Sequence, residues 1–304
     1  MSTRDQPELP DPVRMRTNGI ELSVHLAGAG PVVVLAHGFP DLAYSWRHQV
    51  PALVAAGYRV VVPDMRGYGA SDRPAAVAGY DAETVGADLI GLLDVLGVDR
   101  AAFIGHDWGA NSVWPLAFTR PDRVRGIAGL SVPYLPAAPV SPLDILRNRL
   151  GEDFYMVRFQ PVGPPEDRLA KDVRATLLAI LSDRDPFAEV DSSVLPPWLS
   201  PQELSRYTAA FERTGFGAGL NYYRNMERNW AAAAGRSGTT TAVPALFATG
   251  DRDAVAAFMP SARMSEVFLD LRTTTVAGAG HWVHQQAPDV VNPLLLEFLG
   301  GLPQ

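Results

Sequence analysis

Short apolar runs, each ended by Gly, Pro or Asp, constrain the fold more than any other feature of this 304-residue chain. They consist mostly of Val, Ile, Leu, Phe and Ala and show no alternation of polar and apolar residues. A strand that is apolar on both faces is typical of a parallel sheet covered by helices. We therefore predict buried strands at Val32–Ala36, Arg59–Pro63, Ala101–Gly105 and Ala245–Thr249.

Helical patterns lie between these strands, and the clearest extends from Asp81 to Leu96. Asp81 is a candidate N-cap, and Gly97 is placed to end the helix. Apolar residues recur at helical spacing along this segment, so one face of the helix is suited to packing on a sheet. Alternation of strands and helices predicts an α/β fold with a mostly parallel central sheet flanked by helices.

The alternation stops near Tyr134 and returns near Pro244. The segment between them begins with several prolines and continues as an aromatic-rich helical stretch. We interpret it as a helical lid inserted into one core domain. The predicted bounds are 1–133 and 235–304 for the core and 134–234 for the lid.

The sequence Gly105-His106-Asp107-Trp108-Gly109 directly follows a predicted strand and precedes a helical pattern. Small residues around a strained central residue are the signature of a nucleophile elbow. Here the central residue is Asp107. A carboxylate can attack a saturated carbon that bears a leaving group or a strained ring and form a covalent ester, which favours epoxides or haloalkanes as substrates. The alternative for Asp107 is an ordinary helix N-cap.

A second loop, His37-Gly38-Phe39-Pro40, follows the first strongly apolar strand. In this architecture the loop supplies half of an oxyanion hole. We assign the hole to the backbone N–H groups of Phe39 and Trp108, and we expect a cis peptide bond between Phe39 and Pro40.

Asp253 and His281 complete a candidate catalytic triad with Asp107. The chain order of nucleophile, acid and base is the order of α/β-hydrolases. His281 would activate a water, and Asp253 would orient its imidazole. Asp251 is the rival for the acid role, but it lies too close to the end of the strand, so we favour Asp253.

Two further histidines, His106 and His284, lie near the triad residues in sequence. His284 is three residues after His281, a spacing that can mimic a pair of metal ligands. No acidic partner motif accompanies it, so we interpret it as a surface histidine and predict no metal site. We expect a structural role for His106.

These motifs together resemble those of the soluble and bacterial epoxide hydrolases of the α/β-hydrolase superfamily, over nearly the whole chain. The core motifs are partly shared with haloalkane and haloacid dehalogenases. Two lid segments are more discriminating, because they resemble those that carry catalytic tyrosines in epoxide hydrolases. The matching segments are 37–40, 66–72, 105–109 and 280–282 in the core, and 153–160 and 215–225 in the lid.

The resemblance implies that Tyr155 and Tyr223 are the two lid tyrosines. A ring-opened epoxide leaves as a basic alkoxide and needs a proton, and a phenol with a pKa near 10 can supply it at neutral pH. The alternative is that both are packing aromatics. The implied function is hydrolysis of an epoxide to a vicinal diol through a hydroxyalkyl ester on Asp107.

Two other functions remain open at this stage. A dehalogenase would use the same triad, with the side-chain N–H of Trp108 as a donor to the leaving halide. A catalytically silent binding protein could keep the same fold, because fold alone does not guarantee chemistry. The complete triad argues against the silent protein.

Composition limits the partners. A net charge of −7 disfavours nucleic acid, and no stretch is apolar and long enough to span a membrane. The lack of Cys excludes disulfides but says little about the compartment. The first 16 residues contain no apolar run of a signal peptide, so the expected location is the cytoplasm. We expect a small apolar epoxide and water as ligands, no metal or organic cofactor, and a monomer or homodimer. The predicted substrate-binding residues are His37, Phe39, Trp108, Phe154, Trp198, Phe216, Tyr222 and Trp282.

Overall fold

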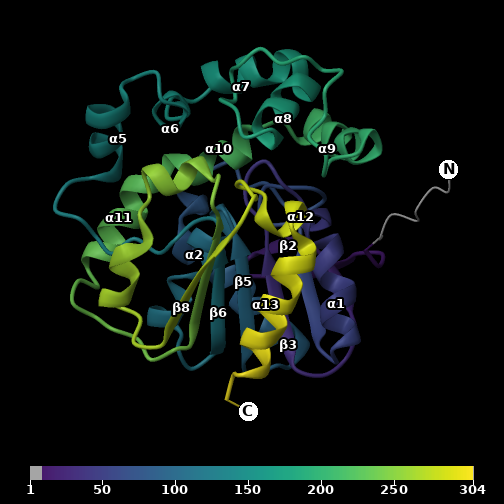
Figure 1. Cartoon of the computed structure of the whole chain (residues 1–304), viewed down its shortest axis with the longest axis vertical. Helices are drawn as coiled ribbons and strands as arrows, with labels where there is room; N and C mark the ends of the chain where they lie inside the picture. Colours follow the sequence, from purple (N-terminus) through teal and green to yellow (C-terminus); the bar gives the residue numbers. More distant parts are fainter. Residues whose placement is uncertain (1–8, 304) are drawn as a thin grey trace.

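The computed structural model describes residues 9–303, and its centre is an 8-stranded sheet in the order β1-β2-β4-β3-β5-β6-β7-β8 (Figure 1). Pairing is parallel from β4 through β8, whereas β1 and β2 are antiparallel at one edge. The predicted α/β class and all four predicted strands are confirmed. The strands are β1 (Val13–Thr17), β2 (Ile20–Ala27), β3 (Val32–Ala36), β4 (Arg59–Pro63), β5 (Ala101–His106), β6 (Val124–Leu130), β7 (Ala245–Gly250) and β8 (Leu271–Val276).

The central strands are apolar throughout because helices cover both faces of the sheet. In β3, Val32 and Val34 pack into one core cluster, and Val33 and Leu35 pack into the other. Successive side chains of a strand point to opposite faces, so each face needs its own apolar set. The helices of the core are α1 (Gln49–Ala55), α2 (Ala82–Leu96), α3 (Trp108–Val113), α4 (Leu116–Thr119), α12 (Val283–Gln286) and α13 (Pro288–Gly300).

Helix α2 shows how local signals fix an element. The Asp81 carboxylate accepts a hydrogen bond from the Thr84 N–H at 2.9 Å, and Gly97 ends the helix with φ 65°. Both predicted ends are confirmed. Short 3-10 helices complete the described chain at Ala43–His48, Val77–Tyr80, Ala170–Asp172, Ala254–Ala257 and Ser261–Glu266.

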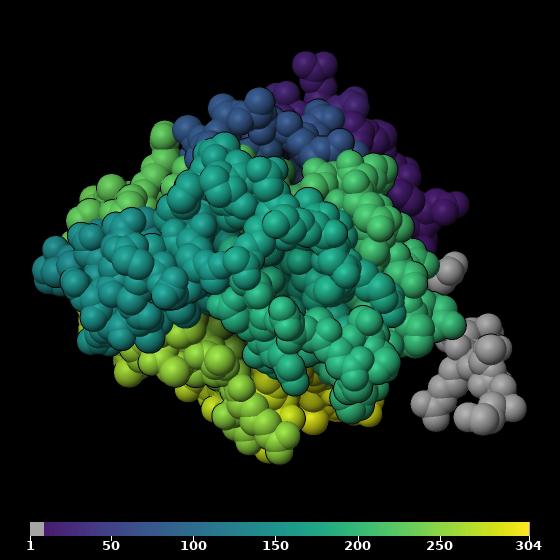
Figure 2. Space-filling view, turned by 90° about the horizontal axis from the view of Figure 1, so that it is seen from above, coloured from purple at the N-terminus to yellow at the C-terminus, as the bar shows by residue number. Residues whose placement is uncertain are grey.

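Seven helices follow one another between β6 and β7, inside the range 134–234 that we expect to form the lid. Most of them lie together over one end of the sheet in Figure 1, and in Figure 2, seen from above, this part of the chain spreads across the face. Nowhere in residues 9–303 is a helix both long enough and apolar enough to cross a membrane. The helices are α5 (Pro142–Leu150), α6 (Tyr155–Arg158), α7 (Pro164–Leu169), α8 (Val173–Leu181), α9 (Pro201–Thr214), α10 (Gly217–Arg224) and α11 (Met226–Ala234).

Buried polar contacts fix these helices to the core. The Tyr222 hydroxyl of α10 donates to the Arg66 carbonyl at 2.8 Å. Glu203 of α9 pairs with Arg47 at 2.7 Å, and both side chains are buried. These contacts hold α9 and α10, both in the range that we expect to form the lid, against the core.

A buried ion pair, Arg66 with Asp88, supports the loop beneath this contact. The guanidinium donates to both carboxylate oxygens at 2.6 and 2.7 Å. Asp88→Ala should lower the free energy of unfolding by about 3 to 5 kcal/mol, because it leaves a buried guanidinium without its partner. Urea unfolding measures the effect. Asp122→Ala, which removes an exposed partner of Arg120, should leave the unfolding midpoint unchanged. Equal shifts of the midpoint in the two variants would contradict a stabilising role of the Arg66–Asp88 pair.

Candidate active site

Asp107 lies in a strained turn between β5 and α3. Its backbone has φ 53° and ψ −121°, which few residues other than glycine adopt. A Cβ on Gly105 would overlap the backbone of Gly109, and a Cβ on Gly109 would overlap the carbonyl of Ala36. The Asp107 side chain forms no capping hydrogen bond with α3. Its carboxylate is therefore not used as a helix N-cap, and the turn has the geometry of a nucleophile elbow.

One oxygen of the Asp107 carboxylate is held by the loop after β3. The Phe39 N–H donates to Asp107 Oδ1 at 2.8 Å. Gly38 is needed next to it, because a Cβ there would overlap the same carboxylate. The Phe39–Pro40 peptide bond is cis, as predicted. The Trp108 N–H, our other predicted donor, forms no hydrogen bond with this carboxylate here.

The other oxygen faces the candidate base. His281 Nε2 lies 3.5 Å from Asp107 Oδ2, and His281 Nδ1 lies 3.2 Å from both carboxylate oxygens of Asp253. Asp251, the rival for the acid role, instead accepts a hydrogen bond from the Gly278 N–H at 2.8 Å. The fold thus brings together the nucleophile, base and acid that we predict from the sequence, with Asp253 as the carboxylate beside the imidazole.

Two carboxylates decide the charge of His281. Burial by itself would lower the pKa of His281. The charge of Asp253 and hydrogen bonds to Asp107 and Asp253 outweigh it, and the pKa lies well above its ordinary value. In the resting site His281 is therefore an imidazolium between two carboxylates.

The backbone of His281 is fixed as firmly as its ring. Its carbonyl accepts hydrogen bonds from Ser131 Oγ at 2.5 Å and from His106 Nε2 at 2.9 Å. Its N–H donates to the carboxylate of Asp183, a lid residue with φ 58°. Gly280 permits this approach, because a Cβ there would overlap Asp183 Oδ2. A lid carboxylate thus helps to position the candidate base, a role that the sequence pattern gave no reason to expect.

Substitution of Asp183 tests this positioning. Asp183→Ala should lower kcat about tenfold with little change in KM, because His281 loses an anchor. Asp183→Asn keeps an oxygen acceptor and should restore most of kcat. Both variants remove a negative charge that favours the imidazolium, so the pKa of His281 falls and the acid limb of the kcat profile moves to lower pH. The other ionisable groups that face this ring are Asp107, Asp253 and His106, and both variants keep them. If the acid limb of the kcat profile stays at the same pH in both variants, Asp183 only packs against His281.

The two predicted lid tyrosines lie together near the nucleophile. Tyr155 begins α6 and Tyr223 belongs to α10, and their ring centroids are 6.1 Å apart. Burial, together with the nearby charge of Asp107, raises the pKa of both phenols well above its usual value. Tyr223 also receives a hydrogen bond from the Trp108 side chain. Both hydroxyls therefore keep their protons at neutral pH and can donate them.

Three of the predicted substrate-binding residues have other contacts in the structure. His37 Nε2 accepts a hydrogen bond from the Met65 N–H at 2.9 Å, and His37 Nδ1 donates to the Gly38 carbonyl at 3.0 Å. Both ring nitrogens are therefore hydrogen-bonded to backbone groups. Burial lowers the pKa of His37 to about 4, and the ring is therefore neutral. Tyr222 binds the carbonyl of Arg66, as described above. Phe216 is stacked on Phe211 at 5.1 Å.

Three more of the predicted substrate-binding residues form aromatic contacts around the triad. Phe154 packs on Tyr155 at 4.7 Å between ring centroids. Trp282 is buried, and its indole N–H donates to the Ile180 carbonyl at 3.3 Å. Trp198 packs on Trp282 at 6.3 Å. These residues surround the site, and their contact with substrate remains a prediction.

The interpretation of His284 as a surface histidine is wrong. The side chain is fully buried, and its ring stacks between those of Trp46 and His106. Its neighbours in sequence gave no sign of this, because the two rings come from distant segments: Trp46 belongs to η1, the 3-10 helix Ala43–His48, and His106 belongs to β5. Burial lowers the pKa of His284 well below its usual value, so the ring is neutral.

Among residues 9–303, Asp41, His106 and His284 form the one group whose ligand atoms lie close enough to share a metal ion. Asp41 is already engaged by the Tyr207 hydroxyl at 2.8 Å and the Leu42 N–H at 2.9 Å. Burial raises the pKa of Asp41 to about 7. We assign no metal to this group, because a half-protonated carboxyl with two hydrogen-bond donors is a poor ligand.

Comparison with known proteins agrees with this geometry. The sequence profile described as alpha/beta hydrolase fold matches residues 31–288. The chain is 45% identical to epoxide hydrolase A of Mycobacterium tuberculosis, over 94% of this chain and 96% of that protein. The chain belongs to the epoxide hydrolase family of the α/β-hydrolase fold. The resemblance inferred from the motifs is thereby confirmed.

Other relatives support the same assignment. Epoxide hydrolase 1 of the plant Siraitia grosvenorii is 39% identical over 93% of this chain and 96% of its own length. The crystal structure of epoxide hydrolase A from Mycobacterium thermoresistibile superposes with a TM-score of 0.92 at 45% identity, covering 97% of this chain and 99% of that chain. The similarity extends through core and lid alike.

Proposed function

We propose that this epoxide hydrolase converts an apolar epoxide and water to a vicinal diol through a covalent ester on Asp107. The observation that carries the proposal is that the two oxygens of the Asp107 carboxylate have different contacts. Oδ1 is held by the Phe39 N–H, whereas Oδ2 is turned toward His281 and the lid tyrosines are close by. Side chains supply every reacting group, so we propose no metal or organic cofactor.

In the first step, Asp107 Oδ2 attacks an epoxide carbon and the carbon–oxygen bond of the ring breaks. Tyr155 and Tyr223 hydrogen-bond the epoxide oxygen, and one phenol transfers its proton as negative charge builds there. The product is a hydroxyalkyl ester, in which Oδ1 is the carbonyl oxygen. The imidazolium of His281 stabilises the ionised nucleophile before attack.

Ester formation removes the charge of Asp107, one of the two charges that raise the pKa of His281. The pKa of the imidazole falls, and the imidazolium gives its proton to the phenolate that ring opening left behind. This transfer restores the phenol and leaves a neutral ring that can act as a base. His281, oriented by Asp253, takes a proton from water, which attacks the ester carbonyl. The oxyanion forms at Oδ1 beside the Phe39 N–H, and closure of the Trp108 N–H on the same atom would complete the hole. The adduct then collapses: the ester bond to the diol breaks, and the departing alkoxide takes the proton of the added hydroxyl. The diol leaves, Asp107 is again a carboxylate and His281 is again an imidazolium.

A dehalogenase, the alternative from the sequence, is less well supported. Its leaving halide needs no proton, whereas two buried, protonated phenols lie near this nucleophile. The indole N–H of Trp108, the donor we considered for a halide, is bonded to Tyr223 instead. The relatives described above are also named epoxide hydrolases.

Diol formation tests the proposal. The purified protein should convert at least one member of a panel that includes styrene oxide, propylene oxide and 1,2-epoxyoctane, and Asp107→Ala should form no diol above the uncatalysed rate. Asp251→Ala, which removes the neighbouring carboxylate outside the triad, should stay active. Halide release from 1-chlorohexane without diol from any epoxide would replace the proposal by the dehalogenase.

A further inference from the structure

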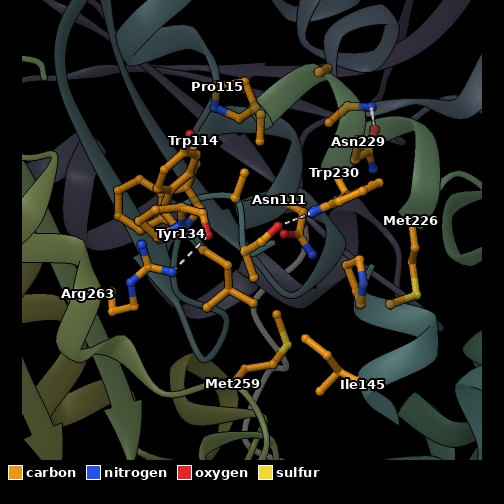
Figure 3. A pocket seen from close by; sticks show the side chains of 18 of the residues that line it. Asn111, Trp114, Pro115, Tyr134, Ile145, Met226, Asn229, Trp230, Met259 and Arg263 are labelled. Atoms are coloured by element: carbon orange, nitrogen blue, oxygen red, sulfur yellow. Dashed lines mark hydrogen bonds between the residues drawn. The ribbon is translucent and has the colours of Figure 1, made fainter. Parts of the chain in front are cut away.

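A cavity of about 420 Å³ lies beside the candidate active site, and we call it the side chamber (Figure 3). Two of its lining residues are immediate neighbours of proposed catalytic residues: Trp108 follows Asp107, and Met156 follows Tyr155. The Trp108 ring also packs on that of Tyr223, with 4.8 Å between centroids, so the side chamber borders the lid tyrosines. Of the aromatic residues that we predict to bind substrate, it contains only Trp108.

The walls of the side chamber are mainly apolar, and their polar atoms are largely in use. The indole N–H of Trp114 donates to the Val132 carbonyl at 3.0 Å, and that of Trp230 donates to the Ala138 carbonyl at 2.8 Å. Tyr134, Ile145 and Met259 line it as well. Four charged side chains also line it, and two of the arginines are paired: Arg236 with Glu83, and Arg263 with Glu266. The mainly apolar remainder of the wall can take a bulky apolar group.

Asn111 is an exception in this wall. Figure 3 shows it amid the lining side chains, and its amide forms no hydrogen bond with another residue of the described range 9–303. Its backbone N–H donates to the Asp107 carbonyl at 3.1 Å, so the residue is fixed one helical turn beyond the nucleophile. The side chain is half-buried and lines the side chamber, and its amide can both donate and accept a hydrogen bond.

We propose that the side chamber holds the substituent of the epoxide and that Asn111 binds a hydrogen-bonding group on that substituent. This inference rests on the proposed function and specifies its substrates. They are epoxides with a bulky apolar substituent, aryl or similar, that bears a hydroxyl, carbonyl or amide. Asn111 lies one turn of α3 beyond Asp107, so we expect the hydrogen-bonding group roughly 6 Å, or about one helical turn, from the reacting carbon.

A matched pair of substrates measures the contact. 4-(Hydroxymethyl)styrene oxide and 4-ethylstyrene oxide have the same number of heavy atoms and differ in one hydroxyl, placed at about this distance from the ring-bound epoxide carbon. The wild type should prefer the hydroxyl compound in kcat/KM. Asn111→Leu conserves the size of the side chain and should lower the preference about fivefold to tenfold. The ratio between the two proteins cancels the intrinsic reactivity of each epoxide.

Two further variants separate the side chamber from general damage. Asn148→Leu, on α5 outside the side chamber, should keep the wild-type preference. Ile145→Trp, which fills the side chamber, should reduce kcat/KM for both styrene oxides at least tenfold more than for propylene oxide. An unchanged preference in Asn111→Leu, or equal losses for large and small epoxides in Ile145→Trp, would overturn the inference while the proposed function stands. If the wild type forms no diol from any epoxide, both this inference and the proposed function are wrong.

Discussion

His281→Gln should trap the covalent intermediate and reduce steady-state diol formation by about a thousandfold. Asp107 can still open the ring in this variant, because the phenols of Tyr155 and Tyr223 supply the proton. The ester then persists, since no base activates the water that should cleave it. Mass spectrometry after mixing with styrene oxide should show one substrate mass added to the peptide that contains Asp107.

His48→Gln is the matched control. His48 is a half-buried histidine at the end of η1 and is not part of the triad. Its replacement should leave both turnover and the mass of the protein after mixing unchanged. A His281→Gln protein that is inactive and unmodified, yet folded by circular dichroism, would show that His281 is needed for ring opening and would contradict the two-step account.

Replacement of both lid tyrosines should nearly abolish epoxide opening. Tyr155→Phe and Tyr223→Phe each remove one proton donor and should each lower kcat/KM about tenfold to a hundredfold, and the double variant should lose about a thousandfold or more. Ring opening itself is slowed, so the ester should not accumulate in the double variant. Single-turnover kinetics with mass detection distinguishes this loss from the loss in His281→Gln.

Tyr58→Phe serves as the control for the tyrosines. Tyr58 is half-buried at the core surface, and the variant should match the wild type. If the double variant keeps diol formation within a few fold of the wild type, the phenols are packing groups and another donor protonates the alkoxide. If it releases halide from a haloalkane at an undiminished rate, the dehalogenase alternative gains support.

Much of the fold could be predicted because its signals are local. The strands β3 and β4 agree with the apolar runs residue for residue, because burial on both faces makes almost every position in them apolar. The cap at Asp81 and the stop at Gly97 likewise depend on groups within a few residues of each other. The elbow is similar: the glycines beside Asp107 report backbone clashes that the turn itself creates.

The rest depends on contacts between distant segments. No residue close to His284 in the sequence indicates that Trp46 and His106 will pack against its ring, so the sequence analysis did not predict that this side chain is buried. Asp183 reaches His281 only because the lid folds back over the core. The side chamber is formed by residues from α3, α5, α11 and the loops after β6 and β7, and no sequence motif links them. Packing of the lid on the core, rather than local pattern, decides these features.

A single turnover in water enriched in oxygen-18 tests the central claim most directly. With enzyme in excess over styrene oxide, the account predicts that the diol contains no heavy oxygen, because the added hydroxyl oxygen comes from Asp107. The heavy atom should be found in the carboxylate of Asp107 after digestion. Immediate incorporation of heavy oxygen into the diol, with none in Asp107, would mean that water attacks the epoxide itself, and it would contradict the covalent mechanism.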